Sequence, residues 1–173
     1  MAWFDTLKEQ AAKIGMGVGA VTGKGFPRTL TVADIMSADV AVATGKFNKL
    51  GEFQIPAQQG YEWGYGSAAQ PENQGYLYVS LKIAAGTQVE GKLRLVVSDA
   101  NETKKVVIYE ERTEVLRGST TDKTQKVPLP RTGPRANEDD KLILELQPDS
   151  AVTVATTAST LLLPVTGYFL SRL

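Results

Sequence analysis

The stretch from Gln74 to Ala84 constrains the fold more than any other part of the chain. Aliphatic side chains occupy alternate positions along it: Leu77, Val79, Leu81 and Ile83. The positions between them are Tyr76, Tyr78, Ser80 and Lys82. Successive side chains of a β-strand point to opposite faces, so the pattern predicts a half-buried strand with its aliphatic face on a core. Burying each aliphatic side chain is worth roughly 1.5–3 kcal/mol.

Several further stretches repeat this device, separated by turn signals. Lys92–Ser98 and Lys141–Gln147 are the clearest, because leucines alternate there with charged or polar residues. The other expected strands are Thr29–Val32, Asp39–Thr44, Phe47–Ile55, Lys104–Val115, Val127–Pro134, Ala151–Thr157 and Leu161–Leu170. The prolines of Val127–Pro134 favour an edge position, since proline cannot donate to a strand ladder.

These strands do not alternate with helices, which excludes the parallel α/β folds. The expected fold is all-β: a single antiparallel β-barrel or sandwich of jelly-roll type with about eight strands. An immunoglobulin-like sandwich is the second choice, because it usually needs only about 100 residues and this chain has 173. We expect two regions, an N-terminal helix with a glycine-rich hinge over 1–25 and the barrel over 26–173.

Residues 2–14 form the one clear helix pattern. Its apolar face carries Trp3, Phe4, Leu7 and Ile14, as an amphipathic helix requires. Two interpretations remain open: this face contacts a membrane or a neighbouring subunit, or it packs on its own domain. The glycine-rich run that follows, GMGVGAVTGKG, predicts a hinge. It fails as a dinucleotide-binding motif because a helix precedes it where a strand is required.

Gln58–Gly75 has little periodicity and is expected to be a long loop. It carries three aromatic residues, Tyr61, Trp63 and Tyr65. Such rings could anchor a protein contact, stack on a sugar or cap one end of the barrel. Contact or capping is favoured over a ligand site, and the sugar-stacking alternative would make the chain a carbohydrate-binding β-sandwich module.

Composition excludes several kinds of chemistry. Lys plus Arg and Asp plus Glu both number 19, so the chain lacks the basic excess of a protein dedicated to nucleic acid. It has neither Cys nor His, which excludes thiol nucleophiles, Ser–His–Asp triads and His-ligated metals. Glu110 and Glu111 point to opposite faces of a strand, and residues 138–140 suit a solvated acidic loop or at best a loose calcium site. We therefore expect no enzyme and no catalytic, cofactor or metal site.

No apolar run approaches the roughly 18–20 residues that span a bilayer. The N-terminus also lacks the basic and apolar regions of a secretory signal. Synthesis in a cytoplasm is the expectation that follows.

The whole chain resembles a family of viral proteins. The resemblance is carried by the start MAWFDTLKEQAAKIG, the run GEFQIPAQQGYEWGYGSAAQPENQGYLYVSLKIAAG and the end LLLPVTGYFLSRL. The chain resembles the smaller of the two major capsid proteins of tailless, icosahedral, membrane-containing bacteriophages of Thermus. The absence of Cys and the low Met count of three would suit a hot host.

The resemblance implies a single-barrel jelly roll that serves as a structural subunit of a virion capsid. It also implies the partners: the chain itself as a homodimer or larger body, a second and larger capsid protein, and an internal viral membrane beneath the shell. The helix from Trp3 to Ile14 becomes a candidate for contact with a neighbour or the membrane, and Gln58–Gly75 a candidate for lateral contacts. The family has no catalytic residues to transfer.

Overall fold

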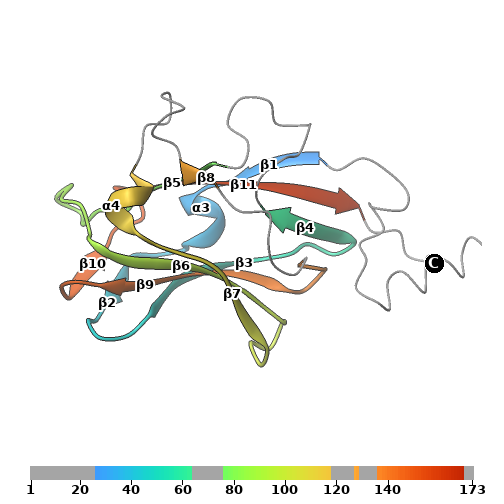
Figure 1. Ribbon diagram of the computed structural model, residues 1–173, viewed down its shortest axis with the longest axis horizontal. Coiled ribbons are helices and arrows are strands. Elements are labelled where there is room, and N and C mark those ends of the chain that lie inside the picture. Colours follow the sequence, from blue (N-terminus) through green and yellow to red (C-terminus); the bar gives the residue numbers. More distant parts are fainter. Residues whose placement is uncertain (1–25, 64–75, 118–126, 129–135, 170–173) are drawn as a thin grey trace, which may run out of the picture.

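The computed structural model describes residues 26–63, 76–117, 127–128 and 136–169. These residues form two facing antiparallel sheets and a short two-stranded ribbon (Figure 1). The helix and hinge expected over 1–25 lie outside the described residues, so that division of the chain stays a prediction.

The first sheet has five strands and is organised around the long strand β11. Its strand order is β1-β11-β5-β8, and β4 also pairs with β11. The bounds are β1 (Phe26–Leu30), β4 (Gln59–Trp63), β5 (Tyr76–Ser80), β8 (Val127–Pro128) and β11 (Thr160–Phe169). β5 pairs with the first residues of β11 and β4 with its last five. Since β1 occupies the other side of β11, β4 and β5 lie along the same side.

The second sheet has four strands in the order β3-β9-β6-β7. Its bounds are β3 (Asn48–Gln54), β6 (Gly91–Ser98), β7 (Lys105–Arg112) and β9 (Lys141–Pro148). A separate ribbon pairs β2 (Val40–Val42) with β10 (Val152–Val154). Two one-turn helices complete the described part, α3 (Val32–Ile35) and α4 (Thr113–Leu116).

This topology is a jelly roll. If β4 and β5 count as one interrupted strand and the ribbon is set aside, the strands numbered along the chain form sheets of order 1-8-3-6 and 2-7-4-5. The chain changes sheet at every connection except the β6–β7 hairpin, which produces the two Greek keys of that fold. The expected all-β, antiparallel, jelly-roll fold is confirmed.

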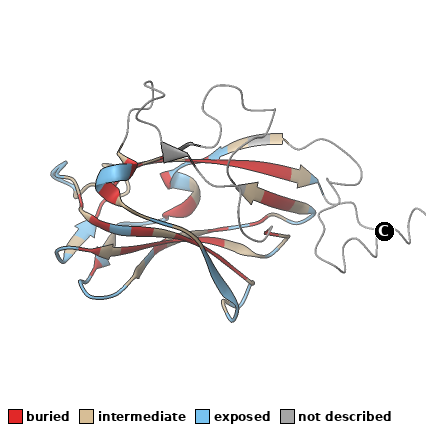
Figure 2. Ribbon diagram, in the orientation of Figure 1, coloured by how far each residue is buried: buried red, intermediate tan, exposed pale blue. Residues whose placement is uncertain are grey.

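The core lies between the two sheets, where the aliphatic sides of the strands meet (Figure 2). The inward positions expected from alternation are confirmed for three strands: Leu77 and Val79 of β5, Leu93, Leu95 and Val97 of β6, and Leu142, Leu144 and Leu146 of β9. β11 adds Leu161, Leu163 and Val165. Each of these side chains is at most 6% exposed.

Several positions that alternation places on an outer face are buried instead, among them Ser80 and Glu145. Ser80 is 4% exposed, and its hydroxyl lies 3.2 Å from the side-chain oxygen of Gln88. Glu145 is 7% exposed, and Arg94 Nε donates to its carboxylate at 2.5 Å, which compensates the buried charge. The Arg94 guanidinium in turn lies 3.9 Å from the centroid of the Phe47 ring, an arrangement that adds cation–π attraction.

Two expected strands give way to one-turn helices before their predicted ends. Thr29–Val32 is strand only to Leu30, because Thr31 begins α3: its backbone N–H donates to the Asp34 carboxylate at 2.8 Å. This bond satisfies one of the donors that a helix N-terminus leaves free. Lys104–Val115 is strand only to Arg112, after which α4 begins.

The expectation that Gln58–Gly75 is a loop is wrong for its first part, since Gln59–Trp63 is strand β4. Tyr61 is fully buried. Its ring packs edge-on against Phe26 and Phe53, with centroid distances of 6.1 and 5.6 Å. Gly167 lies opposite Tyr61 on β11, where a Cβ atom would come within 2.2 Å of the Phe26 ring and 2.7 Å of the Tyr61 ring. The glycine thus makes room for both rings.

The backbone of α3 contacts β3 directly at Gly51. A Cβ atom there would lie 2.0 Å from the Ile35 carbonyl oxygen and 2.7 Å from its carbonyl carbon. The β3–β9 register also shifts between Lys49 and Gly51, as in a β-bulge. This contact packs α3 against β3, an edge strand of the second sheet.

We predict that Gly51→Ala lowers the free energy of unfolding by about 3 kcal/mol, because a methyl group cannot fit against backbone atoms that are unable to move aside. Gly45→Asn is the control. Gly45 has φ +78° and open space around its Cβ direction, and Asn tolerates that backbone region, so the cost should stay below about 1 kcal/mol. Urea denaturation of both variants measures the difference, and equal costs would contradict the close contact.

We predict that Tyr61→Ala lowers the free energy of unfolding by about 3–5 kcal/mol, as expected for loss of a buried aromatic ring. Tyr61→Phe keeps the ring and removes a hydroxyl that donates to Gln59 at 2.7 Å and accepts from Arg28 at 3.1 Å. Its cost should be about 1 kcal/mol. Thermal and urea unfolding measure both. A loss under about 1 kcal/mol for Tyr61→Ala would place the ring outside the core.

Candidate functional site

The residues expected to make contacts do not form one cluster in the described part of the chain. Four of them, Trp3, Phe4, Leu7 and Ile14, lie outside the described residues, and so does Tyr65. Trp63 ends β4, where it pairs with Val165 of β11. Their roles in contact therefore stay predictions.

Tyr61 is different, because its ring belongs to the core and is fully buried. A sugar-stacking platform needs an exposed ring face. The carbohydrate-binding alternative thus loses one of the three aromatic residues on which it depended.

Phe169 is an exposed aromatic residue that sequence reasoning did not single out. It ends β11 and is 64% exposed. Its ring stacks at a tilt on Phe26, with 4.9 Å between centroids. Phe26 also contacts the buried Tyr61 ring, so the exposed ring is the outer end of an aromatic row that reaches the core. A strand pattern alone could not separate its exposed end from its buried centre.

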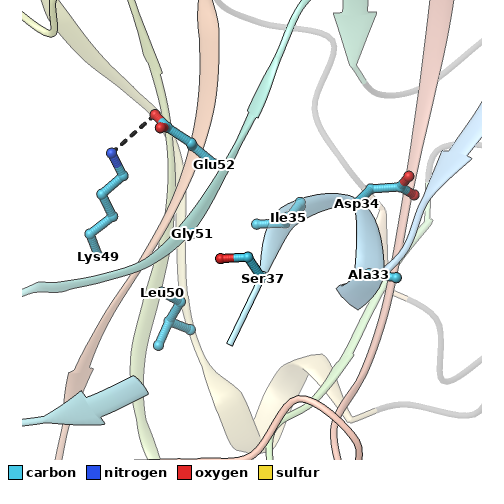
Figure 3. A pocket seen from close by; sticks show the side chains of 8 residues that line it. All are labelled: Ala33, Asp34, Ile35, Ser37, Lys49, Leu50, Gly51 and Glu52. Atoms are coloured by element: carbon cyan, nitrogen blue, oxygen red, sulfur yellow. Dashed lines mark hydrogen bonds and ion pairs between the residues drawn. The ribbon is translucent and has the colours of Figure 1, made fainter. Parts of the chain in front are cut away.

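One open pocket of about 360 Å³ lies between α3 and β3 (Figure 3). Its lining residues are Ala33, Asp34, Ile35, Ser37, Lys49, Leu50, Gly51 and Glu52. The pocket is a depression beside the close contact between Gly51 of β3 and Ile35 of α3. Sequence reasoning did not find it, since no helix was expected between the predicted strands Thr29–Val32 and Asp39–Thr44.

The charges that line this pocket are already paired. Lys49 Nζ lies 3.0 Å from the Glu52 carboxylate, and Lys141 Nζ reaches the same oxygen at 3.1 Å. Burial acts against the charged form of Glu52, but the bonds from Lys49 and Lys141 outweigh it and hold the pKa of Glu52 below its usual value. Burial likewise opposes the charge of Lys49, and its bonds to Glu102 and Glu52 raise the pKa of Lys49.

Asp34 is engaged as well. Its carboxylate accepts the Thr31 N–H that begins α3 and lies 3.4 Å from Arg28 Nη2. An acid–base pair for hydrolysis needs a carboxyl group whose proton is free to move near neutral pH. The arrangement of Asp34, Lys49 and Glu52 suits structural support better than proton transfer.

The other acidic groups considered from sequence also have structural partners. The Gln58 N–H donates to Glu138 at 2.7 Å, and the Asn137 N–H donates to Asp140 at 2.8 Å. Burial raises the pKa of Asp140, against the effect of the Asn137 bond and with the help of Asp99 and Asp139. Across the described ranges, no three His, Asp or Glu side chains gather closely enough to hold a metal ion.

Exposed apolar side chains gather on two elements next to each other in the chain. Val106 and Val107 of β7 are 47% and 46% exposed, and Val115 of α4 is 48% exposed. Figure 2 shows β7 largely exposed at the margin of its sheet. In the described part of the chain, no helix has the length and apolar character needed to cross a membrane. The described surface thus includes an exposed edge strand and exposed apolar side chains.

No protein-family model matches the chain, and no curated protein matches its sequence. Among solved structures it is similar to VP17, a capsid protein of bacteriophage P23-77, with a TM-score of 0.58 and 9% identity over 87% of this chain and 98% of that one. It is also similar to the VP16-VP17 complex of the two major capsid proteins of that phage, with a TM-score of 0.57 and 9% identity over 86% of this chain and 100% of the other. The chain therefore shares its fold with a capsid protein of bacteriophage P23-77 across nearly that protein's full length.

Proposed function

We propose that this chain is a structural subunit of an icosahedral viral capsid. The observation that carries the proposal is the fold shared with VP17, which spans 87% of this chain. The resemblance of the whole sequence to the smaller major capsid protein of membrane-containing Thermus phages points in the same direction. A jelly roll closes its core between two sheets and leaves its outer faces and edges for contacts with other subunits.

The proposed partners are a second copy of the chain and a second capsid protein. The second solved neighbour is a complex of two major capsid proteins, which supports a shell built from two different subunits. In such a shell this chain would be the smaller subunit and its partner the larger one, and an internal membrane would lie beneath both. The face formed by Trp3, Phe4, Leu7 and Ile14 would contact a neighbouring subunit or that membrane.

A role without catalysis fits the described acidic groups. The Glu52 carboxylate pairs with Lys141, and the Asp34 carboxylate accepts the N–H that begins α3. Glu138 and Asp140 accept backbone N–H groups and so support the loop before β9. Each of these carboxylates accepts a bond that supports the fold. The proposal therefore assigns them to stability and the outer surface to assembly.

We predict that the chain forms shells or curved sheets when it is co-expressed with the larger capsid protein of the same viral genome. Negative-stain electron microscopy and light scattering measure this outcome, with each protein alone as the control. Strictly monomeric behaviour of the mixture would count against the proposal. Saturable sugar binding on a glycan array would favour the carbohydrate-binding alternative instead.

We further predict that deletion of residues 1–24 leaves the barrel folded and weakens assembly, because every described strand of both sheets lies within residues 26–169. Circular dichroism should show the same β-rich spectrum and cooperative melting as the full chain, while the yield of assembled particles falls. A truncated protein that does not fold would instead place the N-terminal residues in the core.

A further inference from the structure

The second sheet has two edge strands, and α3 lies against only one of them. At β3 the helix backbone touches the strand, as Gly51 and Ile35 show. At the other edge β7 pairs with β6, and no second strand pairs with it among the described residues. Val106 and Val107, the second and third residues of β7, are nearly half exposed. A long edge strand with exposed apolar residues is a template for pairing with another chain.

β7 carries opposite charges at its two ends. Lys104 and Lys105 stand at its start, and Glu110 and Glu111 stand near its end. Within the described residues neither Lys104 nor Glu110 forms an ion pair, and Lys105 reaches Glu102 only at 3.9 Å. Like charges along an edge would repel a second copy, whereas this polarity attracts a copy that runs antiparallel.

A β-bulge brings these charges onto one face of the sheet. The pairing of β7 with β6 skips Ile108. Lys105 lies opposite Ser98 and Glu110 lies opposite Arg94, and these two β6 positions point to the same face. In a regular strand, residues five apart would point to opposite faces. The extra residue therefore places Lys105 and Glu110 on a common face.

We propose that β7 is a self-association edge, at which a second copy of this chain pairs antiparallel about a two-fold axis between Val107 and Ile108. Two four-stranded sheets then join into one continuous sheet across the axis. This contact specifies how like subunits would associate in the proposed capsid. Only its use in a shell rests on the proposed function.

In this register unlike charges face each other at both ends of the contact. Lys105 lies opposite Glu110 of the second copy, and Lys104 lies opposite its Glu111. The two-fold axis makes each pair occur twice, because Lys105 of either copy faces Glu110 of the other. Opposite charges directly across a strand pair are stabilising.

Competing arrangements lose these pairs. Sliding the second copy by two residues in one direction places Lys105 opposite Arg112, which sets like charges together. Sliding it in the other direction places Lys105 opposite Ile108. A parallel arrangement sets the lysines of both copies side by side. The charge pattern of β7 thus selects both the direction and the register of pairing.

Charge reversal tests the proposal. The variant K104E/K105E makes the edge acidic at both ends, and E110K/E111K makes it basic at both ends. Each variant alone should dimerise more weakly than the unmodified chain, with the dissociation constant raised at least roughly tenfold. An equimolar mixture of the two should dimerise again, because each acidic end then meets a basic one. K46E, at an exposed position between β2 and β3, is the control and should leave dimerisation unchanged.

Sedimentation equilibrium of the full chain measures these constants, and circular dichroism checks the fold of each variant. A second measurement does not depend on the charge variants. The chain has no cysteine, so V107C should be joined to its symmetry mate by a short bismaleimide, while S150C, at an exposed site, should not. Restored dimerisation in the mixture and cross-linking at position 107 support the proposal.

Three results would overturn it: a monomer at about 100 µM, well above the dissociation constants typical of specific contacts, a dimer that survives either charge reversal, or no cross-link at position 107. The capsid role and the β7 contact can be rejected independently of each other. Charge-reversed variants that still assemble with the larger capsid protein would reject the β7 contact and keep the capsid role. A β7 dimer that never assembles with the larger capsid protein would keep the β7 contact and reject the capsid role.

Discussion

The packing of aliphatic side chains between the two sheets is the interaction on which the other features of this structure depend. Leu93 and Leu144 face it from one sheet, and Val79 and Leu163 face it from the other. Each contributes about 1.5–3 kcal/mol when buried. The chain has no cysteine, so no disulfide shares this task. The close contact of α3 with Gly51 and the burial of Tyr61 both require that the sheets first come together.

The sheets leave edges, and the molecule treats each edge differently. β3 has α3 packed against it at Gly51, and β8 lies at the margin of the first sheet. β7 is eight residues long and exposes Val106 and Val107. A long exposed edge strand invites pairing with other chains. For a protein whose proposed role is to assemble, this difference decides where contact can form.

Ion pairs on the outer faces add little stability individually. Arg112, for example, bonds Glu114 and Asp149 at 2.6 Å, but all three side chains are more than a third exposed, and exposed pairs are typically worth well under about 1 kcal/mol. Glu145 differs because it is buried beneath Arg94. The core, rather than the exposed ion pairs, therefore holds the fold.

Alternation in the sequence determined the strands β5, β6 and β9 and their inward faces, because the two-residue period of a strand is a local property of the backbone. From it the antiparallel, all-β class also followed. Only the tertiary structure decided that Tyr61 is buried and that β4 is a strand. Its partner β11 lies about a hundred residues away, and Gly167 makes room for the ring there. The open edge of β7 was decided in the same way: which segments pair, and which strand ends without a partner, depends on contacts between distant parts of the chain.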